Sequence, residues 1–203
     1  MRRGERRQAI LDAAAGLFSD RGYHGTSVRD IAEETGMLSG SLYAHIRSKE
    51  DLLHEIVSAA AAEFIAGVEP IARGDLPPDR KLGEALRAHV RVVAGSIDQA
   101  RVFLHEWRAL SGARLKEITA LRRRYERLWA RIVEEGIASG HFRDVEPRFA
   151  RLLVLSAANW TYQWYRPSGS LGPDEVADRF ADLVLAGLGA RRTARKRKDY
   201  ART

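Results

Sequence analysis

The sequence predicts an all-α protein of about nine helices, with a small three-helix unit at its N-terminal end and a larger helical domain behind it. Two observations support this class. Apolar residues recur at steps of three and four from end to end, which is the period of an amphipathic helix, whereas alternating strand patterns are nearly absent. Capping signals and breaks at Gly and Pro then divide the chain into segments of helical length.

The first three helices are expected over residues 5–20, 28–35 and 39–46. The run Asp20-Arg21-Gly22 is expected to end the first. Ser27 and Asp30 have the spacing of a capping box, which begins the second helix. The second helix stops at Gly36, because Gly can take the left-handed conformation that ends a helix. Ser39 is the expected N-cap of the third helix, which is very short.

Six further helices are expected over residues 51–71, 79–95, 98–109, 113–138, 147–165 and 173–188. Ser48 and Asp51 form a second capping box ahead of the first of these, and Pro70 is expected to break it. The loop RGDLPPD follows and is the one obvious interior linker. Gly140 ends the fourth of these helices, and Pro147 fits the first turn of the next.

The net charge of +7 is concentrated at one end of the chain. Residues 1–50 carry 8 Lys or Arg and 7 Asp or Glu, residues 51–189 carry 19 of each kind, and residues 190–203 carry 7 and 1. We take these ranges as an N-terminal domain, a C-terminal domain and a disordered basic tail. Total charge therefore does not argue for a nucleic-acid partner, and whether the tail contacts DNA or is only solvated stays open.

Composition excludes several classes of protein. The 203 residues contain no cysteine, which rules out disulfides, thiolate metal sites and cysteine nucleophiles. No window approaches the roughly 18 apolar residues of a membrane span. Asp12 interrupts the apolar N-terminal run, so this run is typical of an amphipathic helix rather than of a signal peptide. We expect a soluble, cytoplasmic protein with no membrane partner.

The second and third helices are separated by a short turn that ends at Leu38, which is the pattern of a helix-turn-helix motif. Apolar Ile31 and Leu42 would hold the pair at a fixed angle. Small residues, hydroxyl groups and an imidazole make up the exposed face of the third helix, and residues 35–49 contain no acidic side chain. Such a face suits a phosphate or a base edge. From spacing alone, DNA binding and a packing unit for protein contacts stay equally open.

Residues 25–53, GTSVRDIAEETGMLSGSLYAHIRSKEDLL, resemble the DNA-binding signature of the TetR family of bacterial transcriptional regulators nearly position by position. They depart from it at Met37 and Leu38, where the family more often has Val-Ser, and at Ala44, where a larger residue is common. These departures concern operator preference. The DNA contacts that the resemblance implies are Thr26, Ser27, Arg29, Ser39, Gly40, Ser41, Tyr43, His45 and the phosphate anchor Lys49. Additional phosphate contacts are expected from Arg6, Arg7 and Arg47.

The C-terminal half, residues 103–148 and 159–188, resembles the members of this family that sense acyl-CoA thioesters and govern fatty-acid and sterol degradation. The resemblance implies a ligand-binding domain whose last two helices pair with those of a second subunit in a four-helix interface. The faces expected in this interface are Leu153, Ala157, Ala158 and Trp160 on one helix, and Val176, Phe180, Val184 and Leu188 on the other. A two-fold dimer would bind a palindromic double-stranded DNA operator.

The aromatic stretch NWTYQWYRP, residues 159–167, supplies several candidate ligand contacts. Trp160 and Trp164 are four residues apart, so a continuous helix places them on one face, which we assign to the pocket. Tyr162 and Tyr165 would then turn toward a neighbouring helix or the partner subunit. The full set of expected ligand contacts is Phe103, Trp107, Tyr125, Trp129, Asn159, Trp160, Gln163 and Trp164.

Five Arg residues are candidates for the phosphates of CoA: Arg101, Arg108, Arg122, Arg123 and Arg124. Three consecutive residues point about 100° apart around a helix, so at most one or two of the run at 122–124 can face a pocket. The competing interpretation is that the aromatic residues belong to the core and that the Arg residues are solvated or paired with Glu.

No catalytic or metal site can be defended. His54 and His105 are each followed by Glu, as in a zinc-protease motif, but Ser58 and Ala109 stand where the second His is required. No nucleophile triad, catalytic carboxylate pair or phosphate-binding Gly loop can be defined, so we expect neither an enzyme nor a cofactor.

These features together predict a homodimeric, ligand-responsive transcriptional regulator that mainly represses. A small-molecule effector, by resemblance an acyl-CoA thioester, would release it from its operator. The alternative is a dimeric small-molecule binding protein with little DNA affinity.

Overall fold

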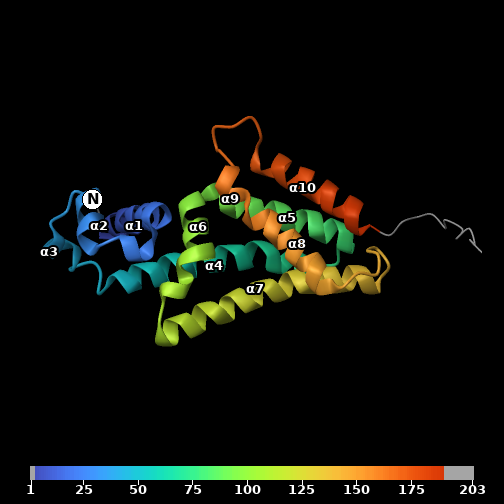
Figure 1. Cartoon of the computed structure of the whole chain (residues 1–203), viewed down its shortest axis with the longest axis horizontal. Coiled ribbons are helices and arrows are strands. Elements are labelled where there is room, and N and C mark those ends of the chain that lie inside the picture. Colours follow the sequence, from blue (N-terminus) through green and yellow to red (C-terminus); the bar gives the residue numbers. More distant parts are fainter. Residues whose placement is uncertain (1–2, 190–203) are drawn as a thin grey trace, which may run out of the picture.

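The computed structural model describes residues 3–189, and its regular structure is helical, which confirms the all-α class. Figure 1 presents a small N-terminal domain at one end, joined through α4 to a larger bundle. The elements are α1 (Arg3–Gly25), α2 (Val28–Glu34), α3 (Ser39–Leu42), α4 (Lys49–Arg73), α5 (Pro78–Gly95), α6 (Ile97–His105), the 3-10 helix η1 (Glu106–Ala109), α7 (Gly112–Ala138), α8 (Pro147–Asn159), α9 (Thr161–Trp164) and α10 (Pro173–Leu188). None of these helices is long and apolar enough to cross a membrane. The predicted basic tail, 190–203, lies outside the described residues.

The N-terminal domain consists of α1, α2 and α3 around an apolar core. Ile31 and Leu42, which we expected to hold α2 against α3, are fully buried. The first capping box is confirmed, because the Ser27 hydroxyl accepts from the Asp30 amide at 3.1 Å and the Asp30 carboxylate accepts from the Ser27 amide at 2.7 Å. Gly36 has a φ of 64°, the left-handed conformation expected at the end of α2. Local sequence signals therefore set the helix-turn-helix geometry.

Two predicted caps differ from the structure. Leu38, not Ser39, is the N-cap of α3, because the Leu38 carbonyl already accepts the first helical amides. At the start of α4 the Ser48 hydroxyl accepts from the Asp51 amide at 3.1 Å. The Asp51 carboxylate pairs with Arg114 on α7 instead of closing the second box. A contact between distant segments has thus replaced a local one.

The long helix α4 continues through Pro70 and ends at Arg73, so the expected break at this proline is wrong. Pro70 lies in the last turn, where the loss of one amide hydrogen bond is outweighed by packing of α4 against α5 and α7. The predicted domain boundary between residues 50 and 51 falls in the first turn of α4. A continuous helix, rather than a linker, therefore joins the two domains.

The C-terminal domain is a bundle in which α4 packs against α5 and α7, and α10 packs on α5 (Figure 1). Two predicted helices are each divided. The one over 98–109 becomes α6 and η1, and the one over 147–165 becomes α8 and α9 with a junction at Trp160. These two divisions account for ten α-helices and one 3-10 helix over residues 3–189 where nine helices were expected.

Candidate DNA-binding face and effector cavity

One surface of the N-terminal domain carries several of the expected DNA contacts. Ser39, Gly40, Ser41 and Tyr43 are all exposed on α3 and at its end, and 56% of the Tyr43 surface meets solvent. The small side chains leave the helix backbone accessible, and Tyr43 adds an aromatic ring with a hydroxyl group. These groups can approach a phosphate or a base edge without obstruction.

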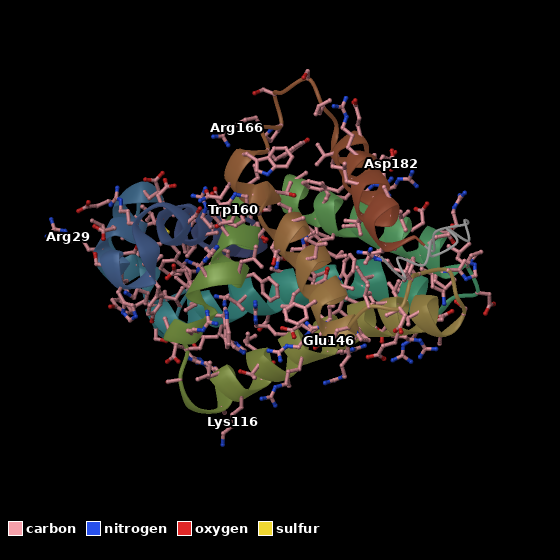
Figure 2. All side chains as sticks on the ribbon, turned by 45° about the vertical axis from the view of Figure 1, so that its right-hand side comes forward. Arg29, Lys116, Glu146, Trp160, Arg166 and Asp182 are labelled. Atoms are coloured by element: carbon pink, nitrogen blue, oxygen red, sulfur yellow. The ribbon has the colours of Figure 1, made fainter. Side chains whose placement is uncertain are left out.

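Ser27 and Arg29 at the start of α2 are also exposed, and in Figure 2 Arg29 projects from the end of the molecule opposite Asp182 of α10. Arg29 pairs with Glu33 at 2.9 Å. Because both side chains lie largely in solvent, such a pair contributes less than about 1 kcal/mol. The Arg29 guanidinium can therefore exchange this carboxylate for a phosphate.

Thr26 and Lys49 do not lie open on this surface, contrary to expectation. Only 1% of Thr26 is exposed, and its hydroxyl is within 3.2 Å of the Leu17 carbonyl and 3.0 Å of the Gly22 carbonyl. The Lys49 ammonium donates to the carbonyls of Tyr23 and Thr26, at 2.7 and 2.6 Å. Both side chains hold the turn between α1 and α2, because buried donors must find acceptors. The main-chain amide of Lys49, in the first turn of α4, is also available for a phosphate, besides the third N–H of its ammonium.

His45 and Arg7 are joined to each other. His45 is half-buried, and its carbonyl accepts from the Arg7 guanidinium. Arg7 also binds the Glu55 carboxylate, with 3.2 Å between Nε and Oε1. Arg7 therefore ties α1 to the turn after α3 and to α4, whereas Arg6 and Arg47 are exposed.

Leu38 is a surface residue that the sequence marked only as a departure from the family pattern. It is 83% exposed at the N-cap of α3, while the neighbouring Met37 packs against the core. An apolar side chain at the start of a recognition helix is placed to contact a thymine methyl group. The departure itself was the signal that could have identified it.

A small cavity lies in the C-terminal domain between α6, α7 and α8. Its volume is about 40 Å³, and its walls are Phe103, Leu104, Arg122, Tyr125, Glu126, Leu155 and Asn159. Three expected ligand contacts meet there: Phe103, Tyr125 and Asn159. Leu104 and Leu155 were missed, because single Leu residues on a helical face carry no distinguishing signal. A buried water needs about 10–15 Å³, so the cavity has room for a few waters, and a larger ligand must widen it.

Arg122 gives this cavity a cationic wall. Its Nη1 donates to the Phe103 carbonyl at 2.9 Å, and its guanidinium lies 4.9 and 4.7 Å from the ring centres of Phe103 and Trp107. Burial lowers the pKa of Arg122. Among the described residues it has no carboxylate within ion-pair distance, and Glu126 pairs with Arg151 at 3.0 Å instead. Most of its donors are therefore unused, and a guanidinium of this kind suits phosphate or carbonyl oxygen.

The other candidates for CoA phosphates do not border the cavity: Arg101, Arg108, Arg123 and Arg124. Arg101 donates to the Ser19 hydroxyl at 3.1 Å, and Arg124 pairs with Glu69 at 2.6 Å. Solvation or pairing with Glu, the competing interpretation for these residues, holds for Arg108, Arg123 and Arg124. Arg101 instead bonds Ser19 and keeps a buried Nε without a partner.

Two further expected ligand contacts, Trp107 and Trp129, pack against residues of the cavity wall. Trp107 covers one side of the Arg122 guanidinium. Trp129 is fully buried, with its ring centre 6.2 Å from that of Tyr125. Both are therefore packing residues around the cavity, and neither borders it in this structure.

Trp160 and Trp164 do not face the cavity, contrary to our prediction, whereas Tyr162 and Tyr165 turn inward toward neighbouring helices, one of the two orientations that we expected. Trp160 and Trp164 leave 56% and 43% of their surfaces exposed, and Gln163 is exposed as well, so none of the three lines the cavity. Tyr162 and Tyr165 are buried instead. The break at Trp160 is the reason, because α9 does not continue the phase of α8 and packs against α5 and α6.

Exposed apolar side chains concentrate on α8, α9 and α10, and we refer to them together as the apolar patch. Six of the nine large hydrophobic side chains that are exposed within residues 3–189 form it: Phe149, Leu152, Leu153, Trp160, Trp164 and Leu183. Ala158 on α8 and several α10 residues that we expected at a dimer interface are buried in the core: Val176, Val184 and Leu188. The outer face of α10 carries Leu183, Ala186 and Gly187. The expected interface side of α10 is therefore wrong, because its more apolar face packs on α5.

The segment from α6 to the start of α7 contacts both the cavity and the N-terminal domain. Phe103 on α6 lines the cavity. The Glu106 carboxylate in η1 accepts from the Tyr23 amide at 2.9 Å, at the end of α1. The Ser111 amide donates to the Glu50 carboxylate at 2.8 Å, in the first turn of α4. A displacement at the cavity wall can thus reach the DNA-binding face through few contacts.

Within the described residues no group of three or more His, Asp or Glu side chains is arranged to hold a metal ion. His54 lies 3.0 Å from a Glu117 oxygen, so it ties α4 to α7.

Comparison with known proteins finds matches to both domains. Residues 10–56 match the family model of bacterial regulatory proteins, tetR family, and residues 75–188 match the model of the tetracyclin repressor-like C-terminal domain. Over 187 residues the chain is 32% identical to the HTH-type transcriptional repressor KstR2 of Rhodococcus jostii, covering 91% of this chain and 92% of that protein.

Solved structures resemble the whole chain as well. The ketosteroid transcriptional regulator KstR2 of Mycobacterium tuberculosis superposes with a TM-score of 0.84 at 29% identity, covering 93% of this chain and 95% of the other. AibR, solved in complex with isovaleryl coenzyme A and operator DNA, superposes with a TM-score of 0.77 at 30% identity, covering 88% of this chain and 97% of the other.

Proposed function

The chain belongs to the TetR family of bacterial regulatory proteins, and from that premise we propose that it is a homodimeric repressor released from a palindromic operator by an acyl-CoA thioester. As a member of this family it is a DNA-binding transcriptional regulator and not an enzyme. What we propose beyond this is that the protein forms a dimer, that it represses, and that its effector is an acyl-CoA thioester. The observation that carries it is the half-buried Arg122, which has no carboxylate partner among the described residues and lines a cavity together with the apolar Phe103 and Leu155.

In this proposal α3 enters the major groove of the operator. Ser41 and Tyr43 face base edges, and Leu38 contacts a thymine methyl group, because these side chains are exposed on one surface. Arg29 and Arg47 bind phosphates on either side. Few cations per subunit are available for this purpose, so the salt dependence of binding has a moderate slope.

The effector enters between α6, α7 and α8. Ligand sites commonly enclose about 300–1,000 Å³, so the cavity of about 40 Å³ represents a closed state that the acyl group widens. Phe103 and Leu155 offer apolar walls to the acyl group, and Arg122 binds an oxygen of the thioester or of CoA. The complex of AibR with isovaleryl coenzyme A supports this class of effector in a related protein.

The apolar patch on α8, α9 and α10 supports a dimer. Patches of this kind on a soluble protein mark interaction sites, and a two-fold axis through the patch pairs it with itself. Ala186 and Gly187 let two α10 helices approach closely beside Leu183. Two α3 helices about 34–36 Å apart would then lie in successive major grooves.

Effector and operator antagonise each other through the α6 to α7 segment. Widening the cavity displaces Phe103, and the displacement passes to α1 through Glu106 and to α4 through Ser111. The α3 helices of the dimer then lose the spacing that the operator requires. An effector that weakens DNA binding tenfold needs a coupling free energy of about 1.4 kcal/mol, and DNA weakens effector binding by the same factor.

The test combines a binding assay with a thermal-shift assay. Fluorescence anisotropy measures binding of the protein to the labelled promoter region beside its own gene, with and without CoA thioesters of increasing acyl size. Free acids and CoA are the ligand controls. At least one thioester is expected to raise the melting temperature and to weaken DNA binding. Arg122→Gln should remove this response, whereas Arg123→Gln, on the solvent side of the same helix, should retain it.

Each contrary outcome overturns a different part of the proposal. DNA binding with no response to any thioester would remove the effector class. Thioester binding without DNA binding would favour the alternative, a dimeric small-molecule binding protein. DNA binding that strengthens with a thioester would reverse the direction of regulation.

A further inference from the structure

Behind the cavity lies a buried polar cluster, which consists of His89 on α5 and Tyr125 and Trp129 on α7. None of the three is more than 6% exposed. The His89 Nδ1 and the Tyr125 hydroxyl are 2.7 Å apart. The surroundings are aromatic, since the Phe64 ring centre lies 4.9 Å from His89 and 5.2 Å from Phe103. The cluster is therefore a polar site with aromatic surroundings.

Several polar atoms of this region lack hydrogen-bond partners. They are His89 Nε2, Trp129 Nε1 and the hydroxyl of Thr161, which lies on α9 where that helix packs against α5. A buried polar atom without a partner costs about 1–3 kcal/mol, and native proteins keep few of them. Concentration of such atoms beside a cavity indicates that a ligand group completes their hydrogen bonding.

The unpaired atoms of the cluster are donors. Burial lowers the pKa of His89 to about 4, so the imidazole is neutral near pH 7. Burial also raises the pKa of Tyr125, so its hydroxyl keeps its proton. We assign the Tyr125 hydroxyl as donor to Nδ1, which puts the imidazole proton on Nε2. The Trp129 indole can only donate; it acts to lower the pKa of Tyr125 and so faces that hydroxyl, but it does not meet hydrogen-bond geometry with it. The cluster therefore lacks a well-placed acceptor for the His89 Nε2 donor.

Tyr125 connects this cluster to the cavity. It lines the cavity and also binds His89, so the cavity wall and the cluster share one residue. The Ala158 carbonyl on α8 acts to raise the pKa of His89 and so faces the imidazole, but it does not meet hydrogen-bond geometry with Nε2. Ala158 is next to Asn159, another wall residue. When α8 moves outward to widen the cavity, the His89 Nε2 donor becomes accessible to an effector.

We propose that this polar cluster selects effectors whose acyl group carries an uncharged oxygen acceptor, such as a ring ketone, which accepts from His89 Nε2. The inference rests on the proposed function. It places the acyl end of the effector, the end far from CoA, at the polar cluster, while Arg122 binds the thioester or CoA end. A ketone fits better than a carboxylate, because the cluster offers neutral donors and no cation in a desolvated interior. His89 is then a binding residue, and Tyr125 is a positioning residue that sets the tautomer of His89.

The experiment compares matched ligands by isothermal titration calorimetry. The ligands are cyclohexanecarbonyl-CoA and the CoA thioesters of its ring-ketone derivatives. Wild-type protein should bind at least one ring ketone about tenfold more tightly than the unsubstituted thioester, because the ketone satisfies a buried donor. His89→Phe should reduce this preference to within about twofold, since the variant keeps the ring shape without the donor. Tyr165→Phe, a buried tyrosine outside the cluster, should keep the full preference.

The outcomes separate this inference from the proposed function. Equal binding of the ketone and unsubstituted thioesters by the wild type overturns the inference, as does an unchanged preference in His89→Phe. Failure of the wild type to bind any thioester while it still binds operator overturns the proposed effector class instead. If His89→Phe does not fold, ¹⁵N nuclear magnetic resonance of the wild type decides. The Nε2 signal of His89 must then shift with the ketone and not with the unsubstituted thioester.

Discussion

Tyr43 is exposed over 56% of its surface on the recognition helix and does not border the effector cavity. We expect Tyr43→Ala to weaken operator binding at least about fivefold, because a base or sugar contact of this kind contributes about 1–3 kcal/mol. The dissociation constant of the effector, measured without DNA, should not change. Fluorescence anisotropy measures the first quantity and calorimetry the second. A parallel loss of effector binding would contradict two separate sites.

His89 should make the stability of the protein depend on pH. Burial lowers its pKa from 6.5 to about 4, so between these values the unfolded chain binds a proton that the folded protein does not. The free energy of unfolding therefore falls as pH falls through this window, by about 2 kcal/mol between roughly pH 7.5 and pH 5 from this group. The loss begins as pH falls below the unfolded pKa, and the contribution is complete above it.

Urea unfolding of wild type and His89→Phe at the two pH values measures this contribution. The difference in unfolding free energy between the two proteins should shift by about 2 kcal/mol between the two conditions, since all other titrating groups are common to both. The variant is expected to be less stable at the higher pH, because it leaves the Tyr125 hydroxyl unpaired. A pH-independent difference would mean that His89 is not buried in its neutral form.

For the helices, a prediction was correct where it depended on neighbouring residues, and it failed where the rotation of one helix relative to the next was needed. Capping and turn signals act within a few residues, so the Ser27 box and the Gly36 stop were predictable. The orientation of Trp160 and Trp164 was not, because it depended on a break in the helix that no local signal announced. Packing of α9 against α5 and α6 turned Tyr162 inward, and periodicity within one segment carries no information about that contact.

The 3-10 helix η1 is the element that we expect to couple the two sites. Glu106→Ala leaves the Tyr23 amide without its partner at 2.9 Å, and should reduce the factor by which effector weakens operator binding. The free energy of unfolding should fall by about 1 kcal/mol. Anisotropy titrations with and without a saturating thioester give the coupling factor directly.

Glu106→Gln is the matched control, because its amide oxygen can still accept from the Tyr23 amide. This variant should keep most of the coupling and of the stability. A Glu106→Ala protein with the full wild-type coupling factor would show that the signal travels by another route, for example through Ser111 and the first turn of α4.

For the whole molecule, the apolar patch predicts the assembly state. Leu183 is 72% exposed on the outer face of α10, and Leu183→Glu should convert the dimer to a monomer, because it places a charge in a desolvated interface. Operator affinity should fall at least about a hundredfold, since two linked recognition helices bind far more tightly than one. Sedimentation velocity measures the assembly state.

Leu76→Glu provides a control of the same chemistry. Leu76 is 45% exposed in the loop between α4 and α5, away from the patch, so this variant should remain dimeric and bind operator normally. A monomeric wild type, or a dimeric Leu183→Glu protein, would place the interface elsewhere.

The sequence by itself determined the all-α class, the bounds of most helices, the helix-turn-helix motif and the family to which it belongs. These features depend on interactions within a few residues or on one contiguous motif. The order of residues along the chain is therefore enough to predict them. The exposed residues of the recognition helix, Ser39 to Ser41 and Tyr43, were predictable for the same reason.

Only the tertiary structure decided which side chains are free to act. Thr26 and Lys49 belong to the DNA-binding motif but are occupied by carbonyls at the end of α1, in contacts that span up to 26 residues. One Arg of five faces the cavity, and the buried His89 became a candidate only because α7 brings Tyr125 beside it. Such outcomes depend on how helices distant in sequence pack and rotate against one another, and hydrogen bonding of each buried group then follows from its neighbours.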